Sequence, residues 1–141
     1  MKTRRIAIVL LLLVAALLLG GCPQPPVYND EYATGLLELK TMVNALVTQV
    51  EKNPSNESFN TALYEPIYSK IAVLRSIVEK EGTRRKDTLG QLDQYRRITG
   101  DFEKLHKDGR FVSEQTLAKS IEYIEDGIDS LIDDENRLKM K

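Results

Sequence analysis

Apolar residues recur at helical spacing through most of the chain after residue 29. In the first such segment, which starts at Asn29 or Asp30, they lie three or four positions apart: Tyr32, Leu36, Leu39, Val43, Leu46 and Val50. This spacing predicts one apolar face of a helix. Leu37 and Val47 widen that face to what a bundle core needs. The residues at positions 53–56, Asn-Pro-Ser-Asn, predict where this first helix ends.

The second segment has the same periodicity but contains a proline. Its apolar positions are Phe59, Leu63, Ile67, Ile71, Leu74 and Val78. Pro66 lacks an N–H group and clashes with the preceding turn, so a helix should break or restart there. We expect a short helical piece near residues 56–64 and a longer helix from Glu65 to Lys80. Gly82 suits the C-cap of that helix.

Two further helices follow. The third is predicted from Thr83 to Lys107, with Asp108-Gly109 as the turn after it. Its apolar face consists of Leu89, Leu92, Ile98, Phe102 and Leu105. The fourth starts after Ser113, a good N-cap residue. Its apolar residues are Leu117, Ile121, Ile124, Ile128, Leu131 and Leu138, a repeat that is interrupted where Glu135 falls on the apolar seam.

The predicted fold is all-α. No run of alternating apolar and polar residues is long enough to predict a strand. Amphipathic helices joined by short polar turns are typical of an antiparallel up-down bundle, here of about four helices, one of them broken at Pro66. The alternative architecture is an elongated helical hairpin that buries its apolar seams by forming an oligomer.

The N-terminal segment has a different pattern. Lys2, Arg4 and Arg5 precede an uninterrupted apolar run at positions 6–19, and Leu19-Gly20-Gly21-Cys22 ends it. The run is shorter than the roughly 20 residues that a membrane-spanning helix needs. Residues 1–22 resemble the signal peptide and lipobox of bacterial lipoproteins. An uncleaved anchor and an ordinary cleaved signal peptide are the alternatives.

The resemblance implies a lipid-anchored protein of the cell envelope. Residues 1–21 would be a signal peptide that is cleaved between Gly21 and Cys22, and the mature chain would begin at Cys22 with lipid on its thiol. Residues 22–29 would form a tether, with prolines at three of the four positions 23–26, and residues 30–141 the bundle domain. Pro23 is not the aspartate associated with inner-membrane retention. The implied location is therefore the outer membrane, facing the periplasm, in an organism that has one.

The charge balance argues against nucleic acid as a partner. The formal net charge of −1 becomes −4 when Lys2, Arg4 and Arg5 are removed with the signal peptide, whereas nucleic-acid binding needs a strongly basic face. The charges are unevenly distributed, with +3 over residues 83–110 and −7 over residues 113–135. Adjacent antiparallel helices of opposite charge would pair favourably. Since Cys22 is the only cysteine, no disulfide can form within the chain.

Two charged groups are candidates for partner docking. The first is a row of acids on the fourth helix, Glu122, Glu125, Asp126, Asp129 and Asp133, which is typical either of a solvated face or of a docking surface. The second is Arg84-Arg85-Lys86 at a helix start, where cations oppose the helix dipole. A solvated turn, anionic lipid headgroups and another protein are the three interpretations of this basic run.

Catalytic and metal chemistry have little support. Glu103 and His106 have the spacing of a carboxylate-bridged di-iron motif, but such a site needs a second motif, and His106 is the only histidine. We therefore predict no metal, and a capping or core-edge role for His106, where the helix C-terminus favours an imidazolium. Neither a glycine-rich phosphate loop nor a nucleophile elbow is present. We predict a protein that is not an enzyme and has no cofactor.

The function that these observations favour is non-catalytic binding or scaffolding of another envelope protein. One alternative is a carrier of a small apolar ligand in the bundle core. Pro66, Gly90, Gly100 and Gly127 would then open a cavity, and the lining would come from Tyr64, Tyr68, Tyr95 and Tyr123. The other alternative is a structural lipoprotein linked to peptidoglycan. Lys141 is similar in position to the terminal lysine of Braun-type lipoproteins, whose ε-amine is joined to peptidoglycan.

Overall fold

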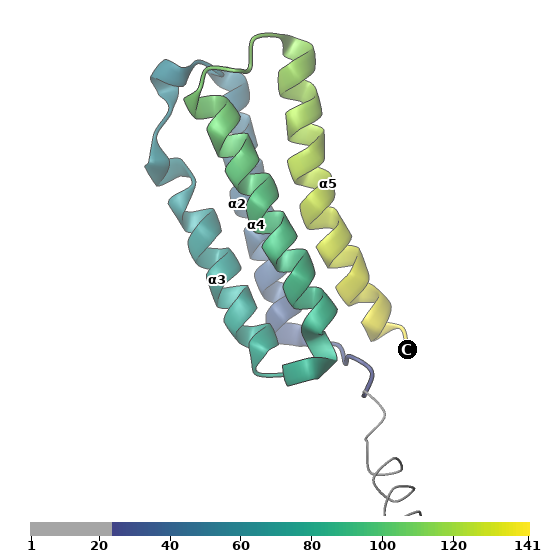
Figure 1. Ribbon diagram of the computed structural model, residues 1–141. Coiled ribbons are helices and arrows are strands. Elements are labelled where there is room, and N and C mark those ends of the chain that lie inside the picture. The colour runs from purple at the N-terminus through teal and green to yellow at the C-terminus, as the bar shows by residue number, and fades with distance from the viewer. Residues whose placement is uncertain (1–23) are drawn as a thin grey trace, which may run out of the picture.

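The computed structural model describes residues 24–141, and the predicted signal peptide and lipidation site lie outside this part of the chain. Four long helices make up the described part, in which no strand occurs: α2 (Asp30–Lys52), α3 (Glu65–Glu79), α4 (Lys86–Lys107) and α5 (Glu114–Lys139) (Figure 1). They run alternately up and down, as Figure 1 shows. The predicted all-α helical bundle is confirmed.

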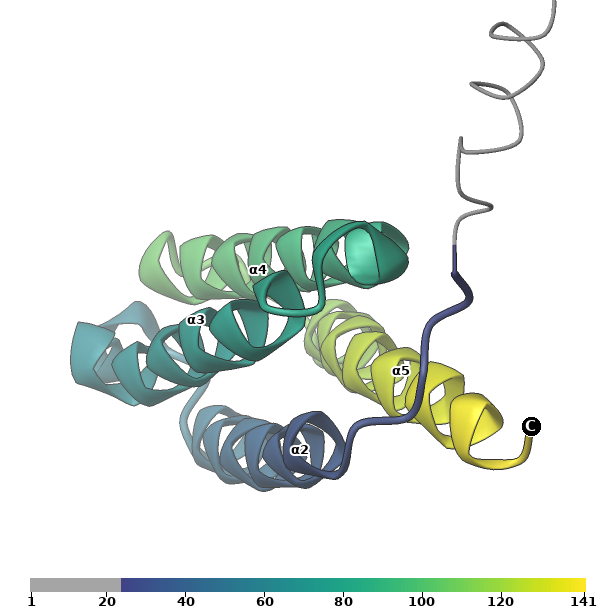
Figure 2. The ribbon, with the colours of Figure 1, turned by 90° about the horizontal axis from the view of Figure 1, so that it is seen from below.

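The helices form a closed ring of neighbours. α2 packs against α3 and α5, and α4 packs against the same two helices, as the end view in Figure 2 also shows. The chain therefore closes its core by itself, and the alternative of an open hairpin is wrong. Tether residues 24–29, the α3–α4 turn and the C-terminus lie at the same end (Figure 1). We call this the tether end.

Local capping explains where two of the helices begin. The side chain of Asn29 accepts a hydrogen bond from the backbone N–H of Tyr32 at 2.9 Å and caps α2. Ser113 caps α5 in the same way, through the N–H of Thr116 at 3.1 Å. Each cap satisfies a backbone donor that a helix start leaves without a partner. The predicted N-cap Ser113 is confirmed, and of the two starts predicted for the first helix, Asn29 is the N-cap.

Pro66 lies in the first turn of α3, where a missing N–H group breaks no helical hydrogen bond. The predicted restart at Glu65 is confirmed. The predicted helical piece before it is wrong, because residues 56–64 form two 3₁₀ turns, Asn56–Ser58 and Thr61–Leu63. Another 3₁₀ turn, Gly82–Arg85, delays the start of α4 to Lys86.

Two turn glycines adopt a conformation that other residues rarely take. Gly82 has a φ of 65° and Gly109 a φ of 63°, both in the left-handed region. Gly109 lies in the turn that ends α4, where the N–H of Arg110 donates to the carbonyl of Leu105 at 2.8 Å. This is a Schellman motif, for which glycine is the preferred residue.

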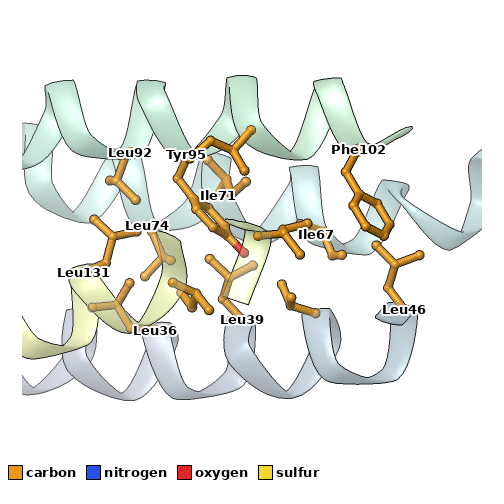
Figure 3. Packing of buried hydrophobic residues seen from close by; sticks show 14 of the residues in the cluster. Leu36, Leu39, Leu46, Ile67, Ile71, Leu74, Leu92, Tyr95, Phe102 and Leu131 are labelled. Carbon is orange, nitrogen blue, oxygen red and sulfur yellow. The ribbon is translucent and has the colours of Figure 1, made fainter. Parts of the chain in front are cut away.

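The apolar seams predicted from spacing meet in one core (Figure 3). All six residues of the first seam are buried, as are Ile67, Ile71 and Leu74 of the second. Leu37 was predicted to widen the first seam, but its side chain is 57% exposed. At 3.6 residues per turn, Leu37 lies about 100° around α2 from Leu36, on the side away from Leu39 and Val43, and so outside the buried face. Val47, predicted with it, is buried.

Candidate functional site

The predicted lipidation and cleavage residues, Cys22 and Gly21, lie outside the described residues. The predicted docking residues lie within them. Glu122, Asp126 and Asp133 are exposed, and Glu125 and Asp129 are half-buried. These five acids lie along one face of α5, since each is three or four positions from at least one other. We call them the acidic stripe.

Most of the acidic stripe has no counter-charge within the bundle. Asp129 forms an ion pair with Lys40 of α2 at 2.5 Å. The other four acids take part in no ion pair among residues 24–141. The expected pairing of α4 with α5 through opposite charges is also absent, because no ion pair joins these two helices in the described part of the chain. Charge complementarity therefore does not hold this helix pair together.

A groove runs beside the acidic stripe, between α4 and α5. It has a volume of about 310 Å³ and is lined by residues of both helices, among them Ile98, Asp126 and Gly127. Tyr123, 57% exposed, and Tyr95 also line it. The hydroxyl of Tyr95 points away from the groove into the core (Figure 3), where it is buried and has no hydrogen-bond partner. Burial also raises the pKa of this phenol.

The four tyrosines of the predicted ligand cavity do not come together. Tyr95 and Tyr123 meet at the α4–α5 groove. Tyr64 is instead hydrogen-bonded to His106, near the end of the bundle opposite the tether end. The hydroxyl of Tyr68 donates to Glu103 at 2.6 Å. Gly127 does not open a gap either, because the ring of Tyr95 packs so closely that an added Cβ would lie 2.9 Å from it.

The three residues of the basic run at positions 84–86 do not share one surface. Arg84 and Lys86 are exposed, but Arg85 is only 1% exposed. The prediction that Arg85 belongs to a docking surface is wrong. Its guanidinium points inward because it binds Glu135, the acid that interrupts the apolar seam of α5.

Arg85 and Glu135 form the centre of a buried polar cluster. Both guanidinium Nη atoms donate to the carboxylate, Nη2 to Oε1 at 3.0 Å and Nη1 to Oε2. The Nε atom of Arg85 donates to Glu81 at 3.1 Å. Bidentate pairs of this kind are among the stronger charge-assisted hydrogen bonds.

The cluster also holds the backbone of the tether. Arg85 Nη2 donates to the carbonyl of Val27, and the N–H of Asn29 donates to Glu135 at 2.7 Å. The side-chain amide of Asn29 donates to Glu81, also at 2.7 Å. Arg85, Glu135, Glu81 and Asn29 therefore tie the tether to the α3–α4 turn and to the end of α5. We call these four residues the tether clamp.

The environment of the clamp keeps Arg85 charged. Burial acts to lower the pKa of its guanidinium, but the hydrogen bonds and charges of Glu135 and Glu81 outweigh this effect and raise it. The guanidinium carbon also lies 5.4 Å from the ring centre of Tyr32, a cation–π distance. Burial of Tyr32 in turn raises the pKa of its phenol.

Sequence reasoning missed the clamp, although one signal pointed to it. Glu135 occupies a seam position of a 26-residue amphipathic helix, and an acid buried at such a position needs a cationic partner. The sequence does not indicate which cation this is, because Arg85 lies 50 positions away.

His106 lies at the other end of the bundle, in a second polar cluster. It is 1% exposed, so the predicted core-edge position is wrong. Its Nδ1 atom lies 2.9 Å from the hydroxyl of Tyr64, and its Nε2 atom lies 3.0 Å from Ser58 Oγ and 3.2 Å from the carbonyl of Ser55. Since the carbonyl can only accept, Nε2 carries the proton and Nδ1 accepts from Tyr64. Burial lowers the pKa of His106, which favours neutral imidazole rather than the expected imidazolium.

No metal-binding arrangement is found among residues 24–141, where no three His, Cys, Asp or Glu side chains are grouped to hold an ion. Glu103 and His106 do not converge, because Glu103 binds Tyr68 and His106 binds Tyr64. Over the same residues, no helix has both the length and the apolar character to cross a membrane. Lys141 is exposed and lies at the tether end (Figure 1).

Comparison with known proteins gives no match: no family model, no curated protein and no solved structure is significantly similar to this chain.

Proposed function

We propose that the protein is a lipid-anchored bundle of the cell envelope that binds another envelope protein and catalyses no reaction. The observation that carries the binding role is the acidic stripe, four of whose five carboxylates have no counter-charge within the described part of the bundle. The lipobox resemblance of residues 1–22 supports the anchor and the location.

The spacing of the acids supports docking over a merely solvated face. Glu122 and Asp126 are four positions apart, and so are Asp129 and Asp133, so each pair lies on adjacent turns of α5. Like charges at this spacing destabilise a helix by a few tenths of a kcal/mol per pair. A basic segment bound along the stripe would remove this repulsion, and the Tyr123 side chain beside it offers apolar contact area. An amphipathic helix laid into the α4–α5 groove is the binding mode that fits.

The anchor would make a weak interaction sufficient. A tether that confines the bundle and its partner to one membrane surface raises their effective concentration. Electrostatic complementarity along the stripe would mainly increase the rate of association and select the partner.

The docking proposal is tested by charge reversal on the full, acylated protein. In native membranes, crosslinking of a tagged chain followed by mass spectrometry should identify one dominant envelope protein. The variant Glu122→Lys/Asp126→Lys should lose that crosslink. The matched control is Glu51→Lys/Glu57→Lys, which reverses two exposed acids outside the stripe and should keep it. Equal crosslinking by both variants would contradict the docking role of the stripe.

The anchor is tested separately, by metabolic labelling with a fatty-acid analogue. The wild-type chain should incorporate the label and sediment with membranes, and Cys22→Ser should do neither. Incorporation of label into the Cys22→Ser variant would show that Cys22 is not the site of lipidation.

The two alternative functions have less support. The α4–α5 groove is open at the surface, which suits a docking segment better than an enclosed apolar ligand. A protein that links a membrane to peptidoglycan would be expected to carry its two attachment points at opposite ends, whereas Lys141 lies at the tether end (Figure 1).

A further inference from the structure

The tether clamp limits how far the bundle can stand from an anchor at Cys22. Arg85 binds the carbonyl of Val27, and Glu135 binds the N–H of Asn29, so the tether follows the bundle surface from Val27 onward. Residues 22–26 alone remain between a lipid on Cys22 and the clamp. Five residues of fully extended chain span at most about 18 Å.

The tether end exposes side chains that suit a lipid surface. Val27 is 59% exposed and Met140 is 80% exposed. The exposed cations at the same end are Lys80, Arg84, Lys86, Arg137, Lys139 and Lys141. Long basic side chains can place their apolar stems against acyl chains and their charges among headgroups. The exposed acids there are Asp30, Glu31, Glu79 and Asp87, so the excess of positive charge is small.

The rest of the bundle carries the opposite sign. The formal charge without Lys2, Arg4 and Arg5 is −4. Four of the eight acids of α5 lie in its half away from the tether end: Glu114, Glu122, Glu125 and Asp126. A bundle held by a short tether over an anionic surface would therefore be repelled if it lay on the acidic stripe. It would be tolerated, or weakly attracted, if it stood on the tether end.

From this short reach and this surface we propose that the tether end is a contact surface for an anionic lipid bilayer. The clamp holds it there, so that the bundle stands upright and the acidic stripe lies along its side rather than against the headgroups. The inference rests on the lipid anchor proposed above and adds to it a fixed orientation of the bundle.

The test places a spin label at either end of the acylated, full-length protein on vesicles. Thr83→Cys puts the label in the exposed α3–α4 turn, and Gln115→Cys puts it at the exposed start of α5, at the opposite end. With Cys22 acylated, the introduced cysteine is the only free thiol. Vesicles of phosphatidylcholine with phosphatidylglycerol serve as the probe, and collision with a water-soluble nickel chelate is measured.

We expect a several-fold lower collision rate for the label at position 83 than for the label at position 115. Equal collision rates on protein that floats with the vesicles would overturn the inference and leave the anchor standing. Protein that fails to float with the vesicles, or that carries no acyl group, would instead overturn the anchor, and with it the proposed function.

Two further variants separate the contributions of charge and reach. Arg84→Glu/Lys86→Glu should raise the collision rate at position 83 on the anionic vesicles. A flexible insertion of ten residues between Pro26 and Val27 lengthens the tether ahead of the clamp and leaves the bundle unchanged, as circular dichroism would check. It should also raise that rate. An unchanged rate in the insertion variant would show that the reach of the tether does not hold this surface on the bilayer.

Discussion

The buried pair of Glu135 and Arg85 brings both a cost and a gain to the stability of the bundle. Each is buried to 2% exposure or less, and removing an ion from water costs several kcal/mol before any partner is met. Their two parallel hydrogen bonds and the contacts to Glu81 and Asn29 offset that cost. Such a pair adds little compared with an apolar core, but the loss of one member leaves the other as a buried charge without a partner.

Glu135→Ala should therefore lower the free energy of unfolding by about 3–5 kcal/mol. The double variant Arg85→Met/Glu135→Met should regain most of the loss, because it removes both charges and keeps their volume. Urea denaturation followed by circular dichroism would measure this. Asp133→Ala, an exposed acid of the same helix, is the control and should change stability by about 0.5 kcal/mol or less. A loss in Glu135→Ala as small as in the control would show that the clamp contributes nothing to stability.

His106 gives the bundle a dependence on pH. Its folded-state pKa is lowered by burial, so below about pH 6.5 the unfolded chain binds a proton that the folded chain does not. Stability should fall as the pH drops from about 7 toward the folded pKa, by at most about 1.4 kcal/mol per pH unit.

His106→Gln isolates this contribution, since the chain has no other histidine. Denaturation midpoints of both proteins at pH 7.5 and pH 5.5 would be compared. The wild type should lose more stability over this interval than the variant does, whatever their absolute stabilities. Equal losses of stability in the two proteins would mean that carboxylates, and not His106, cause the pH dependence.

At the scale of elements, the helix boundaries that depend on local chemistry could be predicted. Asn29 and Ser113 each cap a helix through a backbone N–H three residues further on, and Pro66 favours the first turn of the helix in which it lies. Each boundary therefore follows from a few adjacent residues. The 3₁₀ turns at residues 56–63 and 82–85 could not be predicted. Their conformation goes with contacts to distant elements, such as Ser58 with His106 and Arg85 with Glu135.

Gly127 marks the closest approach of α5 to α4. An added Cβ would lie 2.9 Å from Cδ2 of Tyr95 and 3.4 Å from Cδ1 of Ile98. The Tyr95 ring is buried, and crowding of this kind typically costs about 1–3 kcal/mol. That cost outweighs the roughly 1 kcal/mol that alanine gains over glycine in a helix. Gly127→Ala should therefore lower the melting temperature.

Gly90→Ala is the matched control, because nothing lies within 4 Å of a Cβ added there. This variant should be stabilised by up to about 1 kcal/mol, the difference in helix propensity. Thermal unfolding of the two variants against the wild type would compare them directly. A higher melting temperature in both variants would mean that the Tyr95 ring can move aside for the added Cβ at position 127 without loss of stability.

At the scale of the whole molecule, the bundle and the acidic stripe could be predicted from the sequence, but the clamp that joins the tether to the α3–α4 turn and to α5 could not. Heptad spacing is a local property, so the residues that face the core could be read from each helix alone. The clamp requires residues from the tether, a turn and the last helix to meet, and the fold alone brings these together. For the same reason Arg85 was assigned to the surface by its neighbours Arg84 and Lys86, although its partner lies across the bundle.

The C-terminus should show a sharp threshold for truncation. Removal of residues 139–141 deletes exposed side chains and should change the melting temperature little. Removal of residues 135–141 also deletes Glu135, which leaves Arg85 buried without its main counter-charge, and should destabilise the bundle by at least as much as Glu135→Ala does. A gradual decline across a series of truncations between these two would argue that helix length, and not the clamp, sets the effect.

The tether clamp also has a place in the order in which the bundle folds. The hydrogen bond from Asn29 to Glu135 joins residues 106 positions apart, so it cannot form until residue 135 has emerged. In a chain that emerges N-terminus first, α2, α3 and α4 are present before the residue that secures the tether. Until then the tether can be held only by its contacts with Arg85 and Glu81. Closure of the clamp is thus a late step of folding, because it needs a residue that follows α2, α3 and α4 in the chain.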